Sequence, residues 1–200
     1  MADVSLLPRT FYEREPSEVA PALLGKLLIR KLRKKILVGR IVEVEAYLGN
    51  ADPAAHAYAG MTARNAVLFG PAGHAYVYFI YGMYYCLNFS CEPKGMAGCV
   101  LLRAIEPISG LEEMARLRRV PLKGAPGRLT GGPGKLCQAL DITRSAINGV
   151  DVTQPDSPLQ VADDGLDPRE IVATPRIGIR KAADLPLRFL LKGHHCVSGR

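Results

Sequence analysis

A strand-like run from Ile36 to Leu48 limits most strongly what this chain can fold into. Side chains alternate along a strand, and the residues expected on one face of this run are Ile41, Glu43, Glu45 and Tyr47. Helices do not separate the predicted strands regularly, which argues against a doubly wound parallel sheet. The sequence therefore predicts an α+β fold: a single compact domain with a curved, mostly antiparallel β-sheet core and flanking short helices. The other strands are predicted at 27–29, 75–81, 84–90, 99–105 and 187–192.

Short helices are predicted around these strands. One begins at a Ser17 cap and ends at Gly25, and another follows Ser109-Gly-Leu-Glu112, which has the form of a capping box. A third runs from Lys135 to Leu140. Two hundred residues are enough for one hydrophobic core and too few for two. We therefore expect residues 1–200 to form one domain.

The composition is that of a globular protein, because 48% of the residues are hydrophobic and 22% are charged. No stretch of about 18 uncharged apolar residues occurs, so we expect no membrane span. The first residues lack the basic and apolar regions of a secretion signal, which predicts a cytoplasmic protein.

The cysteines and histidines give no pattern of a metal or disulfide protein. Five cysteines without a Cys-x-x-Cys pair fit neither a disulfide framework nor a zinc knuckle, and they predict buried free thiols. The run His194-His195-Cys196 contains possible metal ligands, but adjacent residues seldom converge on one ion. We therefore expect no metal and no other cofactor.

The charge balance points to a polyanionic partner. Lys and Arg number 26 and Asp and Glu 19, which gives a net charge of +7. Such a balance favours nucleic acid, although basic proteins without that partner are common. The basic residues gather at 30–35 and at 116–128, and the sequence leaves open whether either cluster contacts nucleic acid or is a solvated face.

Two carboxylates make the strand around residue 45 unusual. Glu45 lies at its end, just before a loop that bears His56, and such a position is common for site residues. In an alternative without any catalytic role, Glu43 and Glu45 face water or pair with Arg40 or Arg64.

Tyrosines lie on this strand and on the next two predicted strands. They suit the stacking of a nucleobase, worth about 1–3 kcal/mol per ring, but they also fill cores and sheet edges. Tyr81-Gly82-Met83 marks a hairpin tip, where bulky side chains are poor core material and would suit a wedge between stacked bases. The tyrosines concerned are Tyr47, Tyr76, Tyr78, Tyr81, Tyr84 and Tyr85.

Two polar residues within strands and one glycine-rich loop are further candidates for the site. Asn88 and Arg103 each interrupt an apolar strand, and a buried amide or guanidinium without a partner is costly. Gly131-Gly-Pro-Gly-Lys135 precedes a helix, so its free N–H groups and Lys135 could hold a phosphate, although an ordinary helix-start loop explains it as well.

Taken together, these segments resemble the alkyladenine (3-methyladenine) DNA glycosylase family. The similarity runs in the same order from about Leu7 to Val197, and the short N-terminus is similar to that of bacterial members. The loop 50–61 and the segment 91–98 depart from the pattern. The segments are Gly39-Arg-Ile-Val-Glu-Val-Glu-Ala-Tyr-Leu-Gly49, Ala54-Ala-His56, Arg64-Asn65, Tyr76-Val-Tyr-Phe-Ile-Tyr-Gly-Met83, Leu87-Asn88, Val100-Leu-Leu-Arg103, Gly132-Pro-Gly-Lys-Leu-Cys-Gln-Ala-Leu140, Thr174-Pro-Arg-Ile-Gly-Ile179 and Pro186-Leu-Arg-Phe189.

The resemblance implies a role for each matching position in the pocket. Glu45 matches the general base that activates the attacking water, and Arg103 matches the residue that helps to hold that water and Glu45. Tyr47 and Tyr78 match the rings that sandwich the extruded base, and His56 matches the residue at its edge.

It also implies how the damaged base is selected and how DNA is held. Asn88 matches the residue beneath the pocket that disfavours the exocyclic amino group of guanine. Tyr81 matches the side chain that fills the gap in the duplex, with Met83 beside it. Arg64 matches a basic residue near the DNA backbone.

The resemblance therefore implies a monofunctional DNA-3-methyladenine glycosylase of base excision repair, a hydrolase that acts on N-glycosyl bonds. Its expected partner is double-stranded DNA with damaged purines: 3-methyladenine, 7-methylguanine and, as further candidates, hypoxanthine and ethenoadenine. Base flipping would precede hydrolysis. We expect a monomer.

Two other functions remain open at this stage. A non-catalytic protein that binds damaged nucleic acid would use the same basic residues and tyrosines but would not need Glu45 or Arg103. A carbohydrate glycosidase would need a second carboxylate, for which Glu43, about 6.6 Å away along the strand, is the near candidate.

Overall fold

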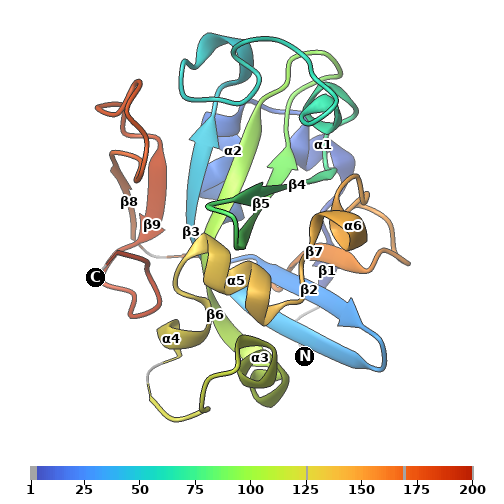
Figure 1. Cartoon of the computed structure of the whole chain (residues 1–200), viewed down its shortest axis with the longest axis vertical. Helices are drawn as coiled ribbons and strands as arrows, with labels where there is room; N and C mark the ends of the chain where they lie inside the picture. The colour runs from blue at the N-terminus through green and yellow to red at the C-terminus, as the bar shows by residue number, and fades with distance from the viewer. Residues whose placement is uncertain (1–3, 125, 169, 200) are drawn as a thin grey trace.

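The computed structural model describes residues 4–124, 126–168 and 170–199, and its described strands all belong to one antiparallel sheet (Figure 1). The strand order is β1-β7-β2-β3-β6-β5-β4, and β9 joins β3 while β8 joins β9. The α+β prediction is confirmed. The strands are β1 (Ser5–Leu6), β2 (Leu27–Leu32), β3 (Lys35–Tyr47), β4 (Ala75–Ile80), β5 (Tyr84–Ser90), β6 (Cys99–Ser109), β7 (Leu159–Asp163), β8 (Ile171–Thr174) and β9 (Arg188–Leu191).

Short helices cover this sheet and its ends. Among them, α1, α4 and α6 were not predicted, and α4 lies in a segment expected to be a loop. The predicted strands and the helix near residue 135 are confirmed, with their ends shifted by a few residues. The helices are α1 (Arg9–Tyr12), α2 (Pro16–Leu23), α3 (Leu111–Arg118), α4 (Gly127–Thr130), α5 (Pro133–Ala139) and α6 (Arg144–Ile147), with single 3-10 turns at η1 (Gly49–Ala51) and η2 (Ala66–Phe69).

The long strand β3 changes partner along its length and so shapes the sheet. Its first half pairs with β2, its residues Glu43–Glu45 pair with β9, and β6 runs along its other edge. Figure 1 shows the result: the β2–β3 hairpin projects toward the lower right, whereas the second half of β3 and β6 stand upright. The predicted curvature of the sheet is therefore confirmed.

Register shifts between β3 and β6 correct the predicted faces of β3. Ile41 pairs with Ile105, Glu43 with Ala104 and Val44 with Leu102, so Val42 and Arg103 are both skipped. Such bulges bend a strand and re-aim side chains. As a consequence, Ile41 lies in the main core and not on the face of the glutamates, and Val42 packs instead against Ala104 and Cys196.

The helix starts differ from the predictions for identifiable reasons. Helix α2 begins at Pro16, a residue suited to the first helical turn, so Ser17 is not its cap. Helix α3 follows Gly110, at which φ is +80° and an added Cβ would lie 2.4 Å from Leu37. The close approach to Leu37 requires glycine there, and the predicted capping box is wrong.

Two predictions from composition can be compared with the described residues. All five cysteines are free and buried, as predicted. No helix in the described part of the chain is long and apolar enough to cross a membrane.

Candidate active site

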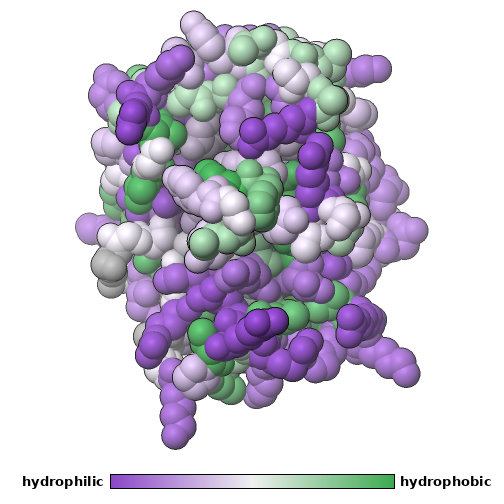
Figure 2. Space-filling model, viewed as in Figure 1, coloured by the Kyte–Doolittle hydropathy of each residue, from purple (hydrophilic) through white to green (hydrophobic). Residues whose placement is uncertain are grey.

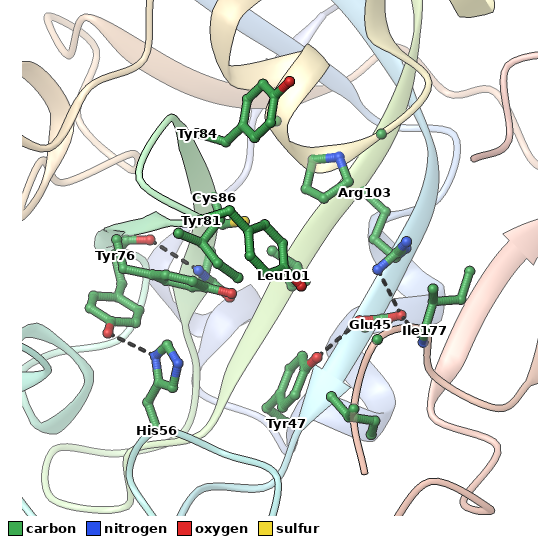
Figure 3. Close-up of a pocket in the computed structure, with 18 of the residues that line it drawn as sticks. Glu45, Tyr47, His56, Tyr76, Tyr81, Tyr84, Cys86, Leu101, Arg103 and Ile177 are labelled. Atoms are coloured by element: carbon green, nitrogen blue, oxygen red, sulfur yellow. Dashed lines mark hydrogen bonds and ion pairs between the residues drawn. The ribbon is translucent and has the colours of Figure 1, made fainter. Parts of the chain in front are cut away.

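A cavity of about 590 Å³ lies where β3, β5 and β6 meet the β4–β5 hairpin, the start of α5 and the segment 177–179 (Figure 3). It brings together most of the predicted site residues. Met83 and Arg64 are not among the residues that line it. The predicted residues in its wall are Glu45, Tyr47, His56, Tyr78, Tyr81, Asn88, Arg103 and Lys135.

The carboxylate of Glu45 is fully buried at the inner wall of this cavity. Its Oε1 accepts the backbone N–H of Ile177 at 2.8 Å and pairs with Nη1 of Arg103 at 3.0 Å. Its Oε2 accepts the hydroxyl of Tyr47 at 2.9 Å (Figure 3). A carboxylate oxygen has two lone-pair positions, so Oε2 retains one for another donor.

Arg103 stays charged in this setting. Burial opposes its charge, but the neighbouring carboxylates of Glu45 and Glu43 outweigh burial and raise the pKa of Arg103. Its position in a bulge of β6 directs the guanidinium toward both glutamates of β3. The predicted contact between Arg103 and Glu45 is confirmed as a contact.

Glu43 does not line the cavity, which removes the basis for a two-carboxylate glycosidase. Its Oε1 lies 2.9 Å from Nε of Arg103 and 2.7 Å from Nε of Arg188. The alternative in which Glu43 and Glu45 face water or pair with Arg40 or Arg64 is also wrong. Both glutamates are fully buried and bound to other arginines, because β9 and the C-terminal segment cover this part of β3.

The ring of Tyr47 is held from behind by an arginine that sequence reasoning did not single out. The guanidinium of Arg176 lies 4.6 Å from the centre of this ring and forms a buried ion pair with Asp52. Burial and the nearby Glu45 raise the pKa of Tyr47, so its phenol is neutral at physiological pH. A neutral, fixed ring is a suitable platform for a planar base.

The opposite side of the cavity carries His56, Tyr76 and Tyr78. Nδ1 of His56 lies 2.9 Å from the hydroxyl of Tyr76, and the His56 and Tyr78 rings meet edge to face at 4.5 Å. Burial lowers the pKa of His56, with a further contribution from Arg64, so its imidazole is neutral near pH 7. Burial also raises the pKa of Tyr78. The aromatic walls of the cavity are thus uncharged.

Asn88 lies on β5 with only 2% of its surface exposed. Its Nδ2 donates to the carbonyl of Tyr76 at 3.1 Å, which fixes the orientation of the amide. The predicted need for a partner at this buried position is therefore met by the backbone of β4. Cys86 and Leu101 lie beside it in the cavity wall.

The β4–β5 hairpin presents two large apolar side chains to solvent. Tyr81 is 76% exposed and Met83 is 62% exposed. Tyr81 and Gly82 both have positive φ, and the N–H of Met83 donates to the carbonyl of Ile80, which describes a type I′ turn. Figure 2 shows a pale to green area across the middle of this face, between purple groups above and below.

Basic side chains lie in the wall of the cavity and near it. Lys135 and Arg118 line it, and Arg64 lies over the ring of Tyr78 with 5.6 Å between its guanidinium carbon and the ring centre. Of the two basic clusters in the sequence, the one at 116–128 therefore reaches the cavity through Arg118. The lining residues include none from the cluster at 30–35.

Sequence comparisons agree with this geometry. The profile of the methylpurine-DNA glycosylase family matches residues 10–195. The chain belongs to this family. As a member, it is a DNA glycosylase, and DNA is its substrate.

Full-length relatives support the assignment. A protein of Koribacter versatilis (strain Ellin345) is 54% identical over 201 residues, covering 100% of this chain and 96% of its own length. One of Methanoculleus marisnigri (strain ATCC 35101 / DSM 1498 / JR1) is 52% identical, covering 97% and 99%. One of Burkholderia cenocepacia (strain HI2424) is 46% identical, covering 98% and 92%. Each is named as an inferred 3-methyladenine DNA glycosylase.

Sequence reasoning gave no structural role to several residues in the wall of the glycosylase cavity or behind it. Ile177 and Arg176 belong to a segment that matched the family, but nothing in a single sequence reveals that a backbone N–H will contact Glu45. Gly134 packs against the ring of Tyr84, where an added Cβ would lie 2.9 Å from the ring, so the start of α5 needs glycine to close the wall.

The C-terminal histidines of the glycosylase lie close together, with ligand atoms of His194, His195 and Cys196 within 4.8 Å of one another. The two imidazole rings are nearly parallel, 4.7 Å apart, and their Nε2 atoms face Glu106 at 3.5 and 3.9 Å. Parallel rings direct their lone pairs side by side and not to one point, unlike a tetrahedral zinc site. That no metal binds here stays a prediction.

Proposed function

We propose that this DNA glycosylase removes alkylated purines, such as 3-methyladenine and 7-methylguanine, from duplex DNA. In this proposal Glu45 activates the water that attacks the anomeric carbon of the flipped nucleotide. The observation that carries the proposal is the carboxylate of Glu45, buried at the wall of an aromatic cavity and bound by three donors.

The donors leave Glu45 able to act as a base. Arg103 and the N–H of Ile177 both bind Oε1, whereas Oε2 receives only the hydroxyl of Tyr47 among the contacts of the described residues. A water that donates to the remaining lone pair of Oε2 would be oriented for attack. A base must be unprotonated to accept the proton of the water, and Arg103 places a positive charge 3.0 Å from Oε1 of Glu45.

An uncharged aromatic cavity suits a cationic leaving group. Alkylation at N3 or N7 gives the purine a positive charge, which is attracted to the faces of aromatic rings. Tyr47 and Tyr78 would supply those faces, and the neutral imidazole of His56 adds no repulsion. A cationic purine also leaves without prior protonation, so one carboxylate suffices where sugar hydrolysis usually requires two. Neutral purines would need an acid, and no residue in the cavity wall is assigned that role.

Selection against normal guanine is proposed for Asn88. Its amide is fixed by the carbonyl of Tyr76 and buried in the cavity wall. An immobile side chain beneath the base would disfavour an exocyclic amino group, because it cannot move aside to make room for it.

Extraction of the nucleotide is proposed for the β4–β5 hairpin. Flipping costs a few kcal/mol in lost stacking and pairing. Tyr81, exposed at the tip and still in the wall of the cavity, would enter the vacated space, with Met83 beside it. Lys135 and Arg118 at the cavity, and Arg64 near it, would bind backbone phosphates.

The decisive test replaces Glu45. Single-turnover release of 7-methylguanine from a duplex should fall at least a thousandfold in Glu45→Gln, because a neutral amide cannot accept the water proton. Affinity for the same duplex should remain. Glu113→Gln, which alters a carboxylate on α3 outside the cavity, serves as the matched control and should cleave like the wild type.

Two outcomes would change the assignment. Excision by Glu45→Gln at the wild-type rate would remove Glu45 as the base. A wild-type protein that binds methylated DNA but never releases a base would be a non-catalytic damage-binding protein, for which the buried Glu45–Arg103 pair would have no use.

The hairpin can be tested separately. Tyr81→Ser should bind a duplex with an abasic-site analogue at least fivefold more weakly, because the serine side chain cannot fill the gap left in the stack. Unchanged affinity would exclude Tyr81 as the inserted side chain.

A further inference from the structure

Glu43, the second glutamate of β3, takes no part in the proposed reaction, yet four donors bind its buried carboxylate. Oε1 accepts Nε of Arg103 at 2.9 Å, Nε of Arg188 at 2.7 Å and the hydroxyl of Ser198 at 2.9 Å. Oε2 accepts the backbone N–H of Ser198 at 2.6 Å. These donors come from β6, β9 and the C-terminal segment, so Glu43 joins three separate parts of the chain.

Arg103 connects this carboxylate to the one that lines the cavity. Its Nε binds Glu43, its Nη1 binds Glu45 at 3.0 Å, and its Nη2 donates to the hydroxyl of Ser198 at 3.2 Å. All three nitrogens of the planar guanidinium are therefore held by different atoms. The angle at which Nη1 meets Glu45 is fixed from the side that faces away from the cavity.

We propose that Glu43, Arg188 and Ser198 are positioning residues that set both the orientation and the charge balance of the Arg103–Glu45 pair. The inference rests on the proposed role of Glu45 as the base. The geometry supports it, because neither Glu43 nor Arg188 lines the cavity and both reach Glu45 only through Arg103 or the sheet.

Charge balance follows from the number of groups. Glu43 and Glu45 contribute two negative charges, and Arg103 and Arg188 contribute two positive charges, so the cluster is neutral. All four are at least largely buried, with exposed side-chain fractions of 0% for both glutamates, 8% for Arg103 and 12% for Arg188. An unpaired charge is costly at such a site, so losing one charge must affect the ionisation of the others.

The other ionisable groups around Glu45 do not alter this balance. Burial raises the pKa of the Tyr47 phenol and of the Cys86 thiol, so both are neutral at physiological pH. Arg176 is charged but is paired with Asp52. The four-group cluster therefore sets the charge in direct contact with Glu45, while Lys135 and Arg118 line the same cavity.

The test uses two substitutions of opposite sign. Glu43→Gln leaves the cluster with a net charge of +1, and Arg188→Gln leaves it with −1. The single-turnover rate of 7-methylguanine release is measured from pH 4.5 to 9 at saturating enzyme, after correction for spontaneous release. We expect the acidic fall of the rate to move down by about one pH unit in Glu43→Gln and up by about one in Arg188→Gln, because positive charge favours the ionised base.

Conservative variants separate charge from shape. Glu43→Asp and Arg188→Lys keep the charge, so the acidic fall should stay at the wild-type pH while the maximal rate drops about tenfold through poorer orientation of Arg103. Ser198→Ala should lower the maximal rate about threefold without moving the pH profile. The enzyme concentration that gives half-saturation should change in none of them, because these residues do not line the cavity.

Each outcome decides between the two proposals. The control is Asp164→Asn, which breaks the Arg40–Asp164 ion pair elsewhere on β3 and should keep the wild-type profile. If the wild type excises the base and both charge variants keep its pH profile, or shift it in the same direction, the positioning role is wrong and the proposed function stands. If the wild type releases no base, the proposed function itself is wrong. Should Glu43→Gln not fold, the two Arg188 variants test the positioning role alone. The pH of the acidic fall should rise in Arg188→Gln and stay unchanged in Arg188→Lys, and any other result would make the positioning role wrong.

Discussion

The ion pair between Arg176 and Asp52 offers a quantitative test of how the wall of the cavity is held. Both side chains have no exposed surface. The two terminal nitrogens of Arg176 donate to the two carboxylate oxygens, and Nη1 also donates to the carbonyl of Ala46 at 3.0 Å. Burial opposes the charge of Asp52, but the hydrogen bond from Arg176 outweighs it, and the pKa of Asp52 is lowered.

Replacing Arg176 by Met keeps the approximate volume but leaves the Asp52 carboxylate buried with only the backbone N–H groups of Leu48 and Ala54 as donors. Removing one member of a buried pair costs about 3–5 kcal/mol. The total stability of a domain is about 5–15 kcal/mol, so this is a large fraction. For a chain of this length, about 2–4 °C is lost per kcal/mol, which predicts a Tm lower by about 6–20 °C.

The measurements are urea unfolding and thermal unfolding, both followed by far-UV circular dichroism because the chain has no tryptophan. The double variant Arg176→Met with Asp52→Asn should recover at least half of the lost free energy, since it leaves no buried charge. A loss below about 1 kcal/mol in the single variant, or a double variant no more stable than the single one, would refute the reasoning.

Three further predictions follow from the same structure. Gly49→Ala should destabilise the fold by at least about 2 kcal/mol, because φ at Gly49 is +60° and the added Cβ would lie 2.5 Å from the carbonyl oxygen of Met96. An unchanged midpoint of urea unfolding would contradict this prediction. Acidification below about pH 4 should lower the Tm, because the hydrogen bond from Arg40 lowers the pKa of Asp164 in the folded state. The stabilisation is present above the pKa of the unfolded state and is lost as the pH falls through the pKa of the folded state. The Tm of Asp164→Asn should fall less on acidification, and an equal fall would argue against this role of Asp164. The buried thiols of Cys91 and Cys137, whose pKa values burial raises, should react with a disulfide reagent at pH 8 only after denaturation, and rapid labelling of either in the native state would contradict their burial.

Alternating and apolar patterns were sufficient to predict β2 to β6 and β9, because burial on one or both faces of a sheet leaves a local signal, but they did not predict the two-residue strand β1. They were insufficient at the bulges of β3 and β6. There the register depends on which residues of a distant strand lie opposite, and this decides that Ile41 and not Val42 enters the main core. The failed capping box has a similar cause, since Gly110 is required by its distance to Leu37.

The candidate site was predicted in part by chemistry and in part by the family resemblance. Glu45 and Tyr47 could be singled out because two carboxylates and a phenol on one strand are unusual. The contacts of Glu45 with Ile177, and of Glu43 with Ser198, join positions 132 and 155 residues apart through a backbone N–H. A backbone N–H is present at every residue except proline, so no side-chain pattern could indicate those two.

The C-terminal contact with Glu43 has a consequence for synthesis of the protein. Strands β3 to β6 leave the ribosome well before residue 198, but until then the glutamates of β3 lack Arg188, Ile177 and Ser198. A nascent or truncated chain that lacks these three residues would therefore leave Glu43 with one of its four described donors and Glu45 with two of its three. The proposed base is thus completed by a residue translated 132 positions after it, later than all the strands from β3 to β6.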